Sequence, residues 1–139
     1  MAEMIPDRLP LKASQGEKKL FSVLQKLPDD YIVYYEPIVE DRYPDFVVIC
    51  PDLGLLVIEV KGWQSKDILS ANNNAVRVKE RHGEVRRNHP VRQARDYMLS
   101  LMDSCLNSNY GKRLLQKNGE YQNRFIFPFV YRAYQREIT

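Results

Sequence analysis

Two apolar segments of strand length lie close together in the middle of the chain and constrain its fold more than any other feature. They are residues 46–50 and 55–58, and the four residues between them, Pro51-Asp52-Leu53-Gly54, are typical of a turn. Both segments are nearly continuous apolar runs rather than alternating ones, as is typical of central strands covered on both faces. We therefore expect a buried pair of strands with helices on either side.

Length and composition limit what surrounds this pair. The 139 residues are enough for one ordinary domain, and 44% of them are hydrophobic, which is sufficient for a core. No stretch approaches the roughly 20 apolar residues of a membrane span, and the N-terminal residues lack the basic-then-apolar layout of a signal peptide. We expect a soluble, cytoplasmic protein without membrane contact, in which Cys50 and Cys105 are reduced, buried thiols.

Local patterns place the remaining elements in the order helix, three strands, helix, strand. Residues 1–13 show no clean period and are predicted to form a flexible arm, followed by a single domain over residues 14–139. Ser14 and Glu17 have capping-box spacing, so the first helix should begin at Ser14 and end near Leu27. The other expected elements are strands over residues 31–36, 45–50 and 55–61, a second helix starting around Asn88 and Pro90, and a last strand over residues 124–133.

Positive charge is concentrated in one part of the chain. From Lys61 to Arg95 there are nine basic and three acidic residues, hence +6 in a chain whose total is +3. The segment is predicted to form one or two exposed basic hairpins that lead into the second helix. The uneven distribution of charge suggests contact with a polyanion. A merely solvated face is the alternative. The residues that we expect to bind nucleic acid are Lys66, Arg77, Lys79, Arg81, Arg86, Arg87 and Arg92.

Glu59-Val60-Lys61 is anomalous because it puts a carboxylate at the end of a buried strand. Alternation places Glu59 and Lys61 on one face, about 7 Å apart, with Val60 on the other. Glu59 is costly to desolvate unless a cation or several donors meet it. Asp45 can face Glu59 only if paired residue numbers sum to an even value, so we predict a connection of three or five residues, or a bulge.

Two carboxylates and an ammonium group together suit phosphodiester hydrolysis. Asp45 and Glu59 would supply hard oxygen ligands for a magnesium ion that keeps several waters. Lys61 would orient or help deprotonate the attacking water and balance the charge of the phosphate. Glu17, which faces inward from the first helix, could add a further carboxylate or reach a second metal ion through water.

Four motifs in this order resemble a known family of nucleases. Pro44-Asp45, Glu59-Val60-Lys61 and Gln93 with Tyr97 resemble the PD-(D/E)xK signature with the Gln-x-x-x-Tyr motif of RecB-like nucleases. Gly16-Glu17 and the segments around Trp63 and residues 88–94 resemble most the NERD, or nuclease-related, domain. The resemblance covers residues 14–131.

This resemblance implies a restriction-endonuclease-like α/β core (αβββαβ), with a mixed sheet of about four strands flanked by helices and a basic hairpin insertion. It implies Asp45, Glu59 and the Val60 carbonyl as ligands of Mg²⁺, for which Mn²⁺ can substitute. Lys61, Glu17, Gln93 and Tyr97 complete the implied catalytic set. DNA is the expected partner, with RNA not excluded, and a helicase or other DNA-processing domain or a second copy of the chain would be further partners.

Simpler interpretations remain open at this point. Glu17 can act only in the capping box, Gln93 and Tyr97 can merely flank the core, and Trp63 can pack rather than stack on a base. The whole chain can be a binding module that keeps the fold but turns over poorly. It can also be a structural domain in which Glu59 and Lys61 form a buried ion pair.

Overall fold

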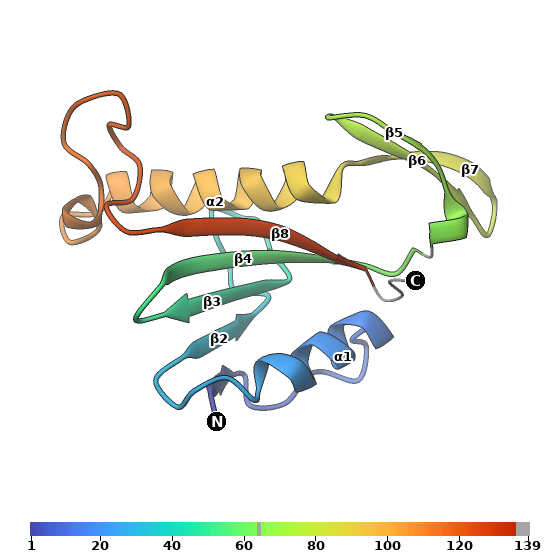
Figure 1. Ribbon diagram of the computed structural model, residues 1–139, viewed down its shortest axis with the longest axis horizontal. Coiled ribbons are helices and arrows are strands. Elements are labelled where there is room, and N and C mark those ends of the chain that lie inside the picture. Colours follow the sequence, from blue (N-terminus) through green and yellow to red (C-terminus); the bar gives the residue numbers. More distant parts are fainter. Residues whose placement is uncertain (64, 136–139) are drawn as a thin grey trace.

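The computed structural model describes residues 1–63 and 65–135 and has a mixed five-stranded sheet at its centre (Figure 1). The strand order is β1-β2-β3-β4-β8, with β1 parallel to β2, β2 and β4 antiparallel to β3, and β8 parallel to β4. The bounds of the strands are Glu3–Ile5 (β1), Ile32–Tyr35 (β2), Phe46–Cys50 (β3), Gly54–Lys61 (β4) and Phe129–Gln135 (β8). The predicted α/β class is confirmed. The expected order of helix, three strands, helix and strand is present, but β1 precedes it, so the central sheet has five strands where about four were expected, and the last strand begins at Phe129 rather than near residue 124.

The connection between β3 and β4 has the parity that the pairing of Asp45 with Glu59 requires. Cys50 pairs with Gly54 and Phe46 pairs with Ile58, so three residues form the turn. Gly54 has φ +117°, and a Cβ there would lie 1.8 Å from the carbonyl oxygen of Pro128. Because only glycine tolerates both this backbone conformation and this approach, the turn and the start of β8 fit together only with glycine at this position.

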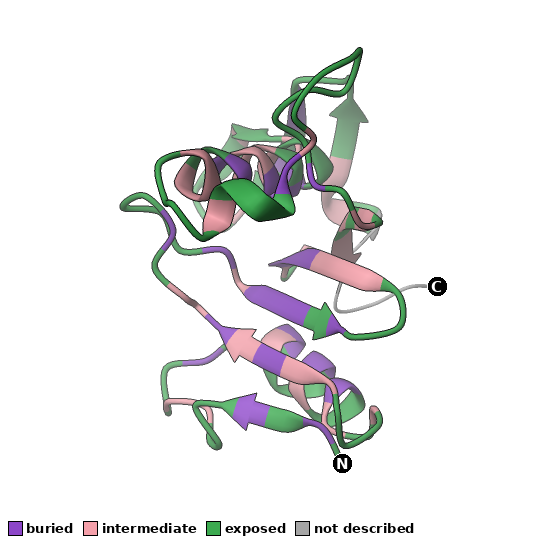
Figure 2. Cartoon of the chain, turned by 90° about the vertical axis from the view of Figure 1, so that its left-hand side faces the viewer, coloured by how far each residue is buried: buried purple, intermediate pink, exposed green. Residues whose placement is uncertain are grey.

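Each face of the sheet is covered by one helix, and each helix encloses its own core (Figure 1). Helix α1 (Gln15–Leu24) buries Leu20 and Leu24 against Val33, Phe46 and other residues of β2, β3 and β4. Helix α2 (Pro90–Leu106) buries Met98 and other residues on the opposite face. Figure 2 shows the burial that results, with β3 buried along most of its length. The continuous apolar runs of β3 and β4 are therefore explained by helices on both sides.

The helix starts follow the local sequence. Ser14 is the N-cap of α1 and forms a complete capping box with Glu17, as predicted, although the helix ends at Leu24 rather than near Leu27. The N-cap of α2 is His89 and not Asn88, because the Nδ1 atom of His89 accepts a hydrogen bond from the Val91 amide at 3.2 Å. None of the described helices is long and apolar enough to cross a membrane.

Residues 1–13 differ from the flexible arm that was predicted for them. Glu3–Ile5 form β1 at the edge of the sheet, and Ala2 and Met4 are buried against the α1 core. A three-residue strand is too short for its alternation to be seen in the sequence. Its stability comes from pairing with β2, which lies almost thirty residues further along the chain.

A second, smaller sheet is inserted between β4 and α2. A short 3₁₀ helix (η1, Ser65–Asp67) leads into β5 (Ile68–Ala71), β6 (Ala75–Glu80) and β7 (Gly83–Asn88), which pair antiparallel in that order. The basic hairpins predicted for this segment are therefore confirmed. Figure 1 shows this sheet beyond the N-terminal end of α2, on the side of the molecule toward which β4 runs.

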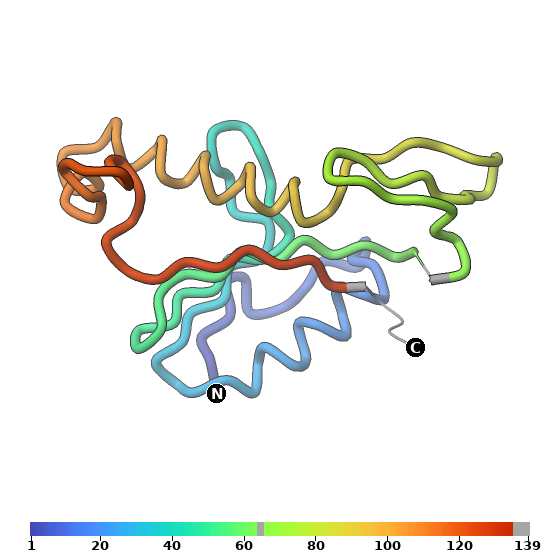
Figure 3. The backbone as a smooth tube through the Cα atoms, turned by 45° about the horizontal axis from the view of Figure 1, so that its top comes forward, coloured from blue at the N-terminus to red at the C-terminus, as the bar shows by residue number. Residues whose placement is uncertain are grey.

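The loop between β2 and β3 rises beside α2. Val39 and Arg42 form an isolated bridge around Glu40 and Asp41, which both have positive φ angles of 48° and 63°. Figure 3 shows this loop, in cyan, alongside the α2 helix. The loop therefore brings residues from the middle of the chain to the helix that carries Gln93 and Tyr97.

Candidate metal centre and basic cleft

Glu59 and Lys61 lie on the same face at the end of β4, as their spacing predicts. The Lys61 Nζ atom is 3.7 Å from the Glu59 Oε1 atom. The side chain of Glu59 is 6% exposed and that of Lys61 is 24% exposed. The two side chains therefore form an ion pair, of which Lys61 is partly accessible to solvent and Glu59 is almost fully buried. The second Glu59 oxygen, Oε2, is buried and has no hydrogen-bond partner among the described residues.

Asp45 joins this pair from the neighbouring strand. Continuing the β3–β4 register by one residue beyond Phe46 and Ile58 places Asp45 opposite Glu59. The backbone N–H of Val60 donates to the Oδ2 atom of Asp45 over 2.7 Å. This strong, charge-assisted bond holds one Asp45 oxygen at the sheet. The predicted meeting of Asp45, Glu59 and Lys61 is thus present in the structure, while their catalytic roles stay predictions.

The electrostatics of the carboxylates are dominated by burial. Burial raises the pKa of Glu59 to about 9, the neighbouring Asp45 carboxylate adds to this rise, and Lys61 opposes it. The pKa of Asp45 is also raised by burial, against the lowering effect of the Val60 amide bond. Two carboxylates this close repel each other when both are ionised. A divalent cation, with more charge than one lysine, stabilises the ionised form of both.

Two further carboxylates lie close to Asp45, one from α1 and one from the end of β2. The carboxylate oxygens of Glu17, Glu36 and Asp45 lie within 4.8 Å of one another. The two carboxylate oxygens of Glu17 have different surroundings. Oε1 accepts a hydrogen bond from the Ser14 amide at 3.2 Å, and Oε2 is buried without a hydrogen-bond partner among the described residues. The helix cap and the carboxylate cluster are therefore not exclusive alternatives. Burial and these carboxylates also raise the pKa of Tyr35.

Glu36 is a member of this cluster that was not predicted from the sequence. It was assigned only to the end of a strand closed by Pro37. Tyr35 pairs with Phe46, so the same register brings Glu36 next to Asp45, and the Glu36 amide donates to the Asp45 carbonyl over 3.0 Å. The available signal was an acidic residue at the end of the strand that precedes Asp45, but its significance depends on a pairing that the sequence did not determine.

The donor set fits a hard divalent cation. The two buried carboxylate oxygens without a hydrogen-bond partner among the described residues are Glu59 Oε2 and Glu17 Oε2, and both residues interact electrostatically with Asp45. Carboxylate oxygens are the ligands that Mg²⁺ and Mn²⁺ prefer. Isolated buried oxygens of this kind are rare unless an ion or a water satisfies them. The cluster can therefore hold a metal ion, whose identity the residues alone do not specify.

Gln93 and Tyr97 lie one turn apart on α2 and contact each other. The Gln93 Nε2 atom donates to the Tyr97 hydroxyl over 3.2 Å. Burial raises the pKa of Tyr97, Gln93 opposes this shift, and the charges of Glu59 and Asp45 contribute to it. Tyr97 is therefore close enough to the carboxylates to feel their charge. Tyr97 thus lies near the acidic centre with Gln93 bonded to it, and the roles expected of both residues stay predictions.

A cleft of about 850 Å³ opens on the solvent side of Gln93 and Tyr97. Its walls come from the β2–β3 loop, from the turn after β5, from β7 and from the first turns of α2. Gln93 and Tyr97 line this cleft, whereas Asp45 and Glu59 do not. The charged residues of its walls are Asp41, Arg42, Arg86, Arg87, Arg92 and Asp96. Four arginines against two aspartates make the cleft positively charged.

The seven basic residues predicted to bind nucleic acid are divided by the structure. Arg86, Arg87 and Arg92 line the cleft, whereas Lys66, Lys79 and Arg81 line a separate hollow of about 590 Å³ beside Trp63. Arg77 lines neither and forms an ion pair with Glu84. Arg42 lines the cleft but was not predicted, because it lies outside the basic segment and reaches α2 only through the fold of its loop.

The comparisons with known proteins agree with this description. The family described as the nuclease-related domain, NERD, matches residues 12–131 of the chain. Fold and site thus define an α/β domain with an acidic centre beside a basic cleft. The chain belongs to the NERD family. No curated protein and no solved structure matches it.

Proposed function

We propose that this domain is a metal-dependent nuclease that hydrolyses the phosphodiester bonds of DNA. One observation carries the proposal: Asp45, Glu59 and Lys61 converge at the end of β4, with a buried Glu59 oxygen that lacks a partner among the described residues. A structural ion pair between Glu59 and Lys61 would need no second carboxylate and would not leave an oxygen unsatisfied.

Asp45, Glu59 and the Val60 carbonyl would hold Mg²⁺, with Mn²⁺ as a substitute, and Glu17 and Glu36 would support the ion from their positions beside Asp45. When bound, the ion supplies charge stabilisation for the phosphate and lowers the pKa of a bound water. Lys61 orients the attacking water and balances phosphate charge from the solvent side of the Glu59 pair. Gln93 and Tyr97 position the phosphate or the lysine from α2.

The substrate strand is proposed to lie in the arginine-lined cleft. Arg42, Arg86 and Arg92 can neutralise phosphates on either side of the bond that is cut, whereas Arg87 is already paired with Glu80. Backbone contacts of this kind distinguish RNA from DNA poorly, so RNA remains a second possible substrate.

A second candidate function is a nucleic-acid-binding module with little activity alone. One observation favours it, since Asp45 and Glu59 do not line the cleft and the side chain of Glu59 is almost fully buried. In that case a helicase or another DNA-processing domain, or a second copy of the chain, would open the path to the carboxylates.

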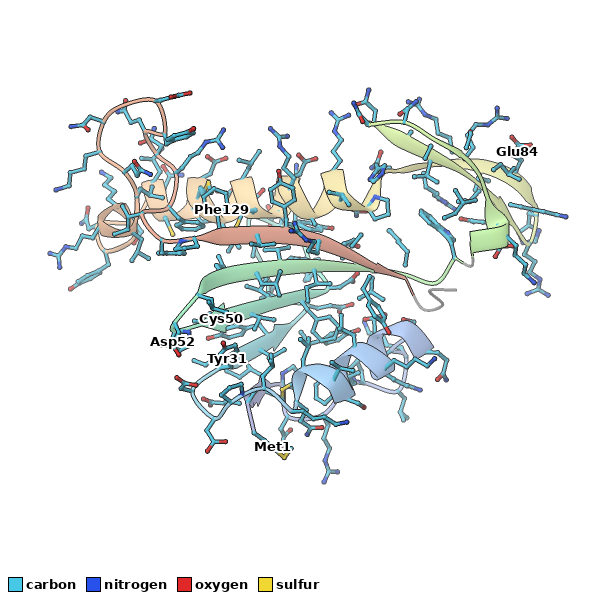
Figure 4. All side chains as sticks on the ribbon, viewed as in Figure 1. Met1, Tyr31, Cys50, Asp52, Glu84 and Phe129 are labelled. Atoms are coloured by element: carbon cyan, nitrogen blue, oxygen red, sulfur yellow. The ribbon has the colours of Figure 1, made fainter. Side chains whose placement is uncertain are left out.

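The test is cleavage of linear, circular and single-stranded DNA with Mg²⁺, with Mn²⁺ or with a chelator. Asp45→Ala and Lys61→Ala should abolish the cleavage. Asp52→Ala is the matched control, because Asp52 is an exposed acid in the turn at the far end of β3 and β4 (Figure 4) and should have no effect. Metal and DNA binding without cleavage would favour the binding module, and binding of neither would contradict both proposals.

A further inference from the structure

The amine of Lys61 has two partners, a carboxylate and an aromatic ring. Its Nζ atom is 3.7 Å from Glu59 Oε1 and 5.6 Å from the ring centroid of Trp63. A cation at this distance from an indole ring is attracted by the ring's negative face. A lysine side chain is a flexible four-carbon stem, so two partners define the position of its amine better than one.

Trp63 borders the small sheet. It lines a hollow together with Ile68, Ala71 and Val76 of that sheet and with Ala133 of β8. It also lines the neighbouring hollow with Glu80, at the end of β6. Because Trp63 follows β4 by only two residues, it connects the end of the central strand to the insertion.

Glu80 is held in place by Arg87. Two hydrogen bonds join the Glu80 carboxylate to the Arg87 guanidinium, over 2.9 Å and 2.7 Å. The pKa of Glu80 is lowered first by these bonds, and a hydrogen bond from Trp63 and the charge of Lys61 lower it further. These interactions form a row in which each side chain interacts with the next, in the order Glu59, Lys61, Trp63, Glu80 and Arg87.

We propose that Trp63 and Glu80 are positioning residues for Lys61, so that the small sheet β5–β7 holds the catalytic amine at the carboxylates. The proposal rests on the nuclease function proposed above, which supplies the task of Lys61. Without the ring, the amine would swing into solvent. Substrate would still bind in the cleft, but the amine would be misplaced for the chemical step.

The first test compares variants of this row with a matched variant of the same sheet. Trp63→Leu is expected to lower kcat by about five- to tenfold, with KM for DNA changed by less than about twofold. Trp63→Phe keeps an aromatic face and should restore most of the loss. Glu80→Gln should lower kcat by about threefold. Glu84→Gln, which removes an equivalent ion pair with Arg77 elsewhere on the hairpin, should leave kcat unchanged.

A second readout does not depend on cleavage. Acylation of lysine amines by acetic anhydride, mapped by mass spectrometry, should show faster modification of Lys61 in Trp63→Leu and Glu80→Gln than in the native chain or in Glu84→Gln. Unchanged Lys61 reactivity in both variants would overturn the proposal, even if the native chain does not cut DNA. A rise in KM alone in the Trp63 variants would also overturn it and would indicate that Trp63 stacks on a base.

Discussion

The two sheets of this molecule differ in whether their acidic side chains are buried or accessible to water. In the central sheet, Asp45 and Glu59 are withdrawn from water, and burial raises the pKa of both. In the small sheet, Glu80 and Glu84 remain accessible and each pairs with an arginine of the same sheet. Figure 4 shows Glu84 on the small sheet, well away from the end of β3 where Cys50 lies.

The difference separates buried carboxylates, which carry the proposed chemistry, from accessible carboxylates that are already paired with arginine. Exposed ion pairs such as that of Arg77 and Glu84 contribute little to stability, since water screens both partners. A buried carboxylate without sufficient partners lowers the stability of the fold. Such a residue is therefore typical of a functional site. The buried pair is therefore the better indicator of function, and the following predictions test that distinction.

The largest effect is expected on cleavage. Glu59→Gln preserves the shape of the side chain but removes its charge, and we expect the cleavage rate to fall by roughly a thousandfold, equal to about 4 kcal/mol of transition-state stabilisation. Glu84→Gln removes a carboxylate from the small sheet and should cleave at the native rate. Steady-state cleavage of a fluorescent oligonucleotide measures both, and equal losses would refute the distinction between the two sheets.

Metal binding should stabilise the native fold. At a concentration of Mg²⁺ or Mn²⁺ about 100 times the dissociation constant, the free energy of unfolding should rise by about 2.7 kcal/mol. Asp45→Asn should lose most of this gain, because Asp45 interacts with both Glu17 and Glu59. Thermal denaturation with metal and with chelator provides the measurement. The same gain in both proteins would place the metal elsewhere.

A smaller effect should appear in the pH dependence of stability without metal. The pKa of Glu59 is about 9 in the folded state and near 4.5 when exposed, so between these values the folded state holds more protons than the unfolded state. The free energy of unfolding should therefore fall as the pH rises through this range. Urea denaturation at several pH values should show a shallower fall in Glu59→Gln, and parallel curves would contradict the assignment.

The smallest effect is expected from single arginines. Arg92→Ala should weaken DNA binding about three- to tenfold and should reduce the salt dependence of log K by about 0.9, as expected when one phosphate is no longer neutralised by the protein. Arg77→Ala should have less effect, because Arg77 is paired with Glu84 outside the cleft. Fluorescence anisotropy over a series of salt concentrations, in the presence of a chelator, compares the two. A larger loss of affinity for Arg77→Ala would move the DNA path to the outer face of the small sheet.

Much of the centre could be predicted because it depends on short-range rules. The Ser14 cap needs only residues within one helical turn, and the shared face of Glu59 and Lys61 needs only the alternation of a strand. The meeting of Asp45 with Glu59 required one further step, the parity of a three-residue turn. The contact between Gln93 and Tyr97 likewise follows from their spacing on one helix.

The features that were not predicted depend on contacts between distant segments. Strand β1 is held by β2, Glu36 reaches Asp45 through the β2–β3 register, and Arg42 reaches the cleft through the path of its loop. The seven predicted basic residues are divided between the cleft, a second hollow and an ion pair. The positions of these charges along the sequence did not predict that division. Each of these outcomes depends on which surfaces meet after collapse, and many alternative arrangements satisfy the same local pattern.

The sequence by itself determined the class of fold, the cap of the first helix, the buried strands and the carboxylate that is out of place among apolar residues. Periodicity and capping act over a few residues, so they leave a readable trace in the chain. Only the tertiary structure decided that Glu36 joins Glu17 and Asp45, that Arg42 faces α2, and that Trp63 lies against Lys61. These contacts form when long loops close, and the entropy of closure depends so weakly on loop length that sequence distance does not reveal which ends meet.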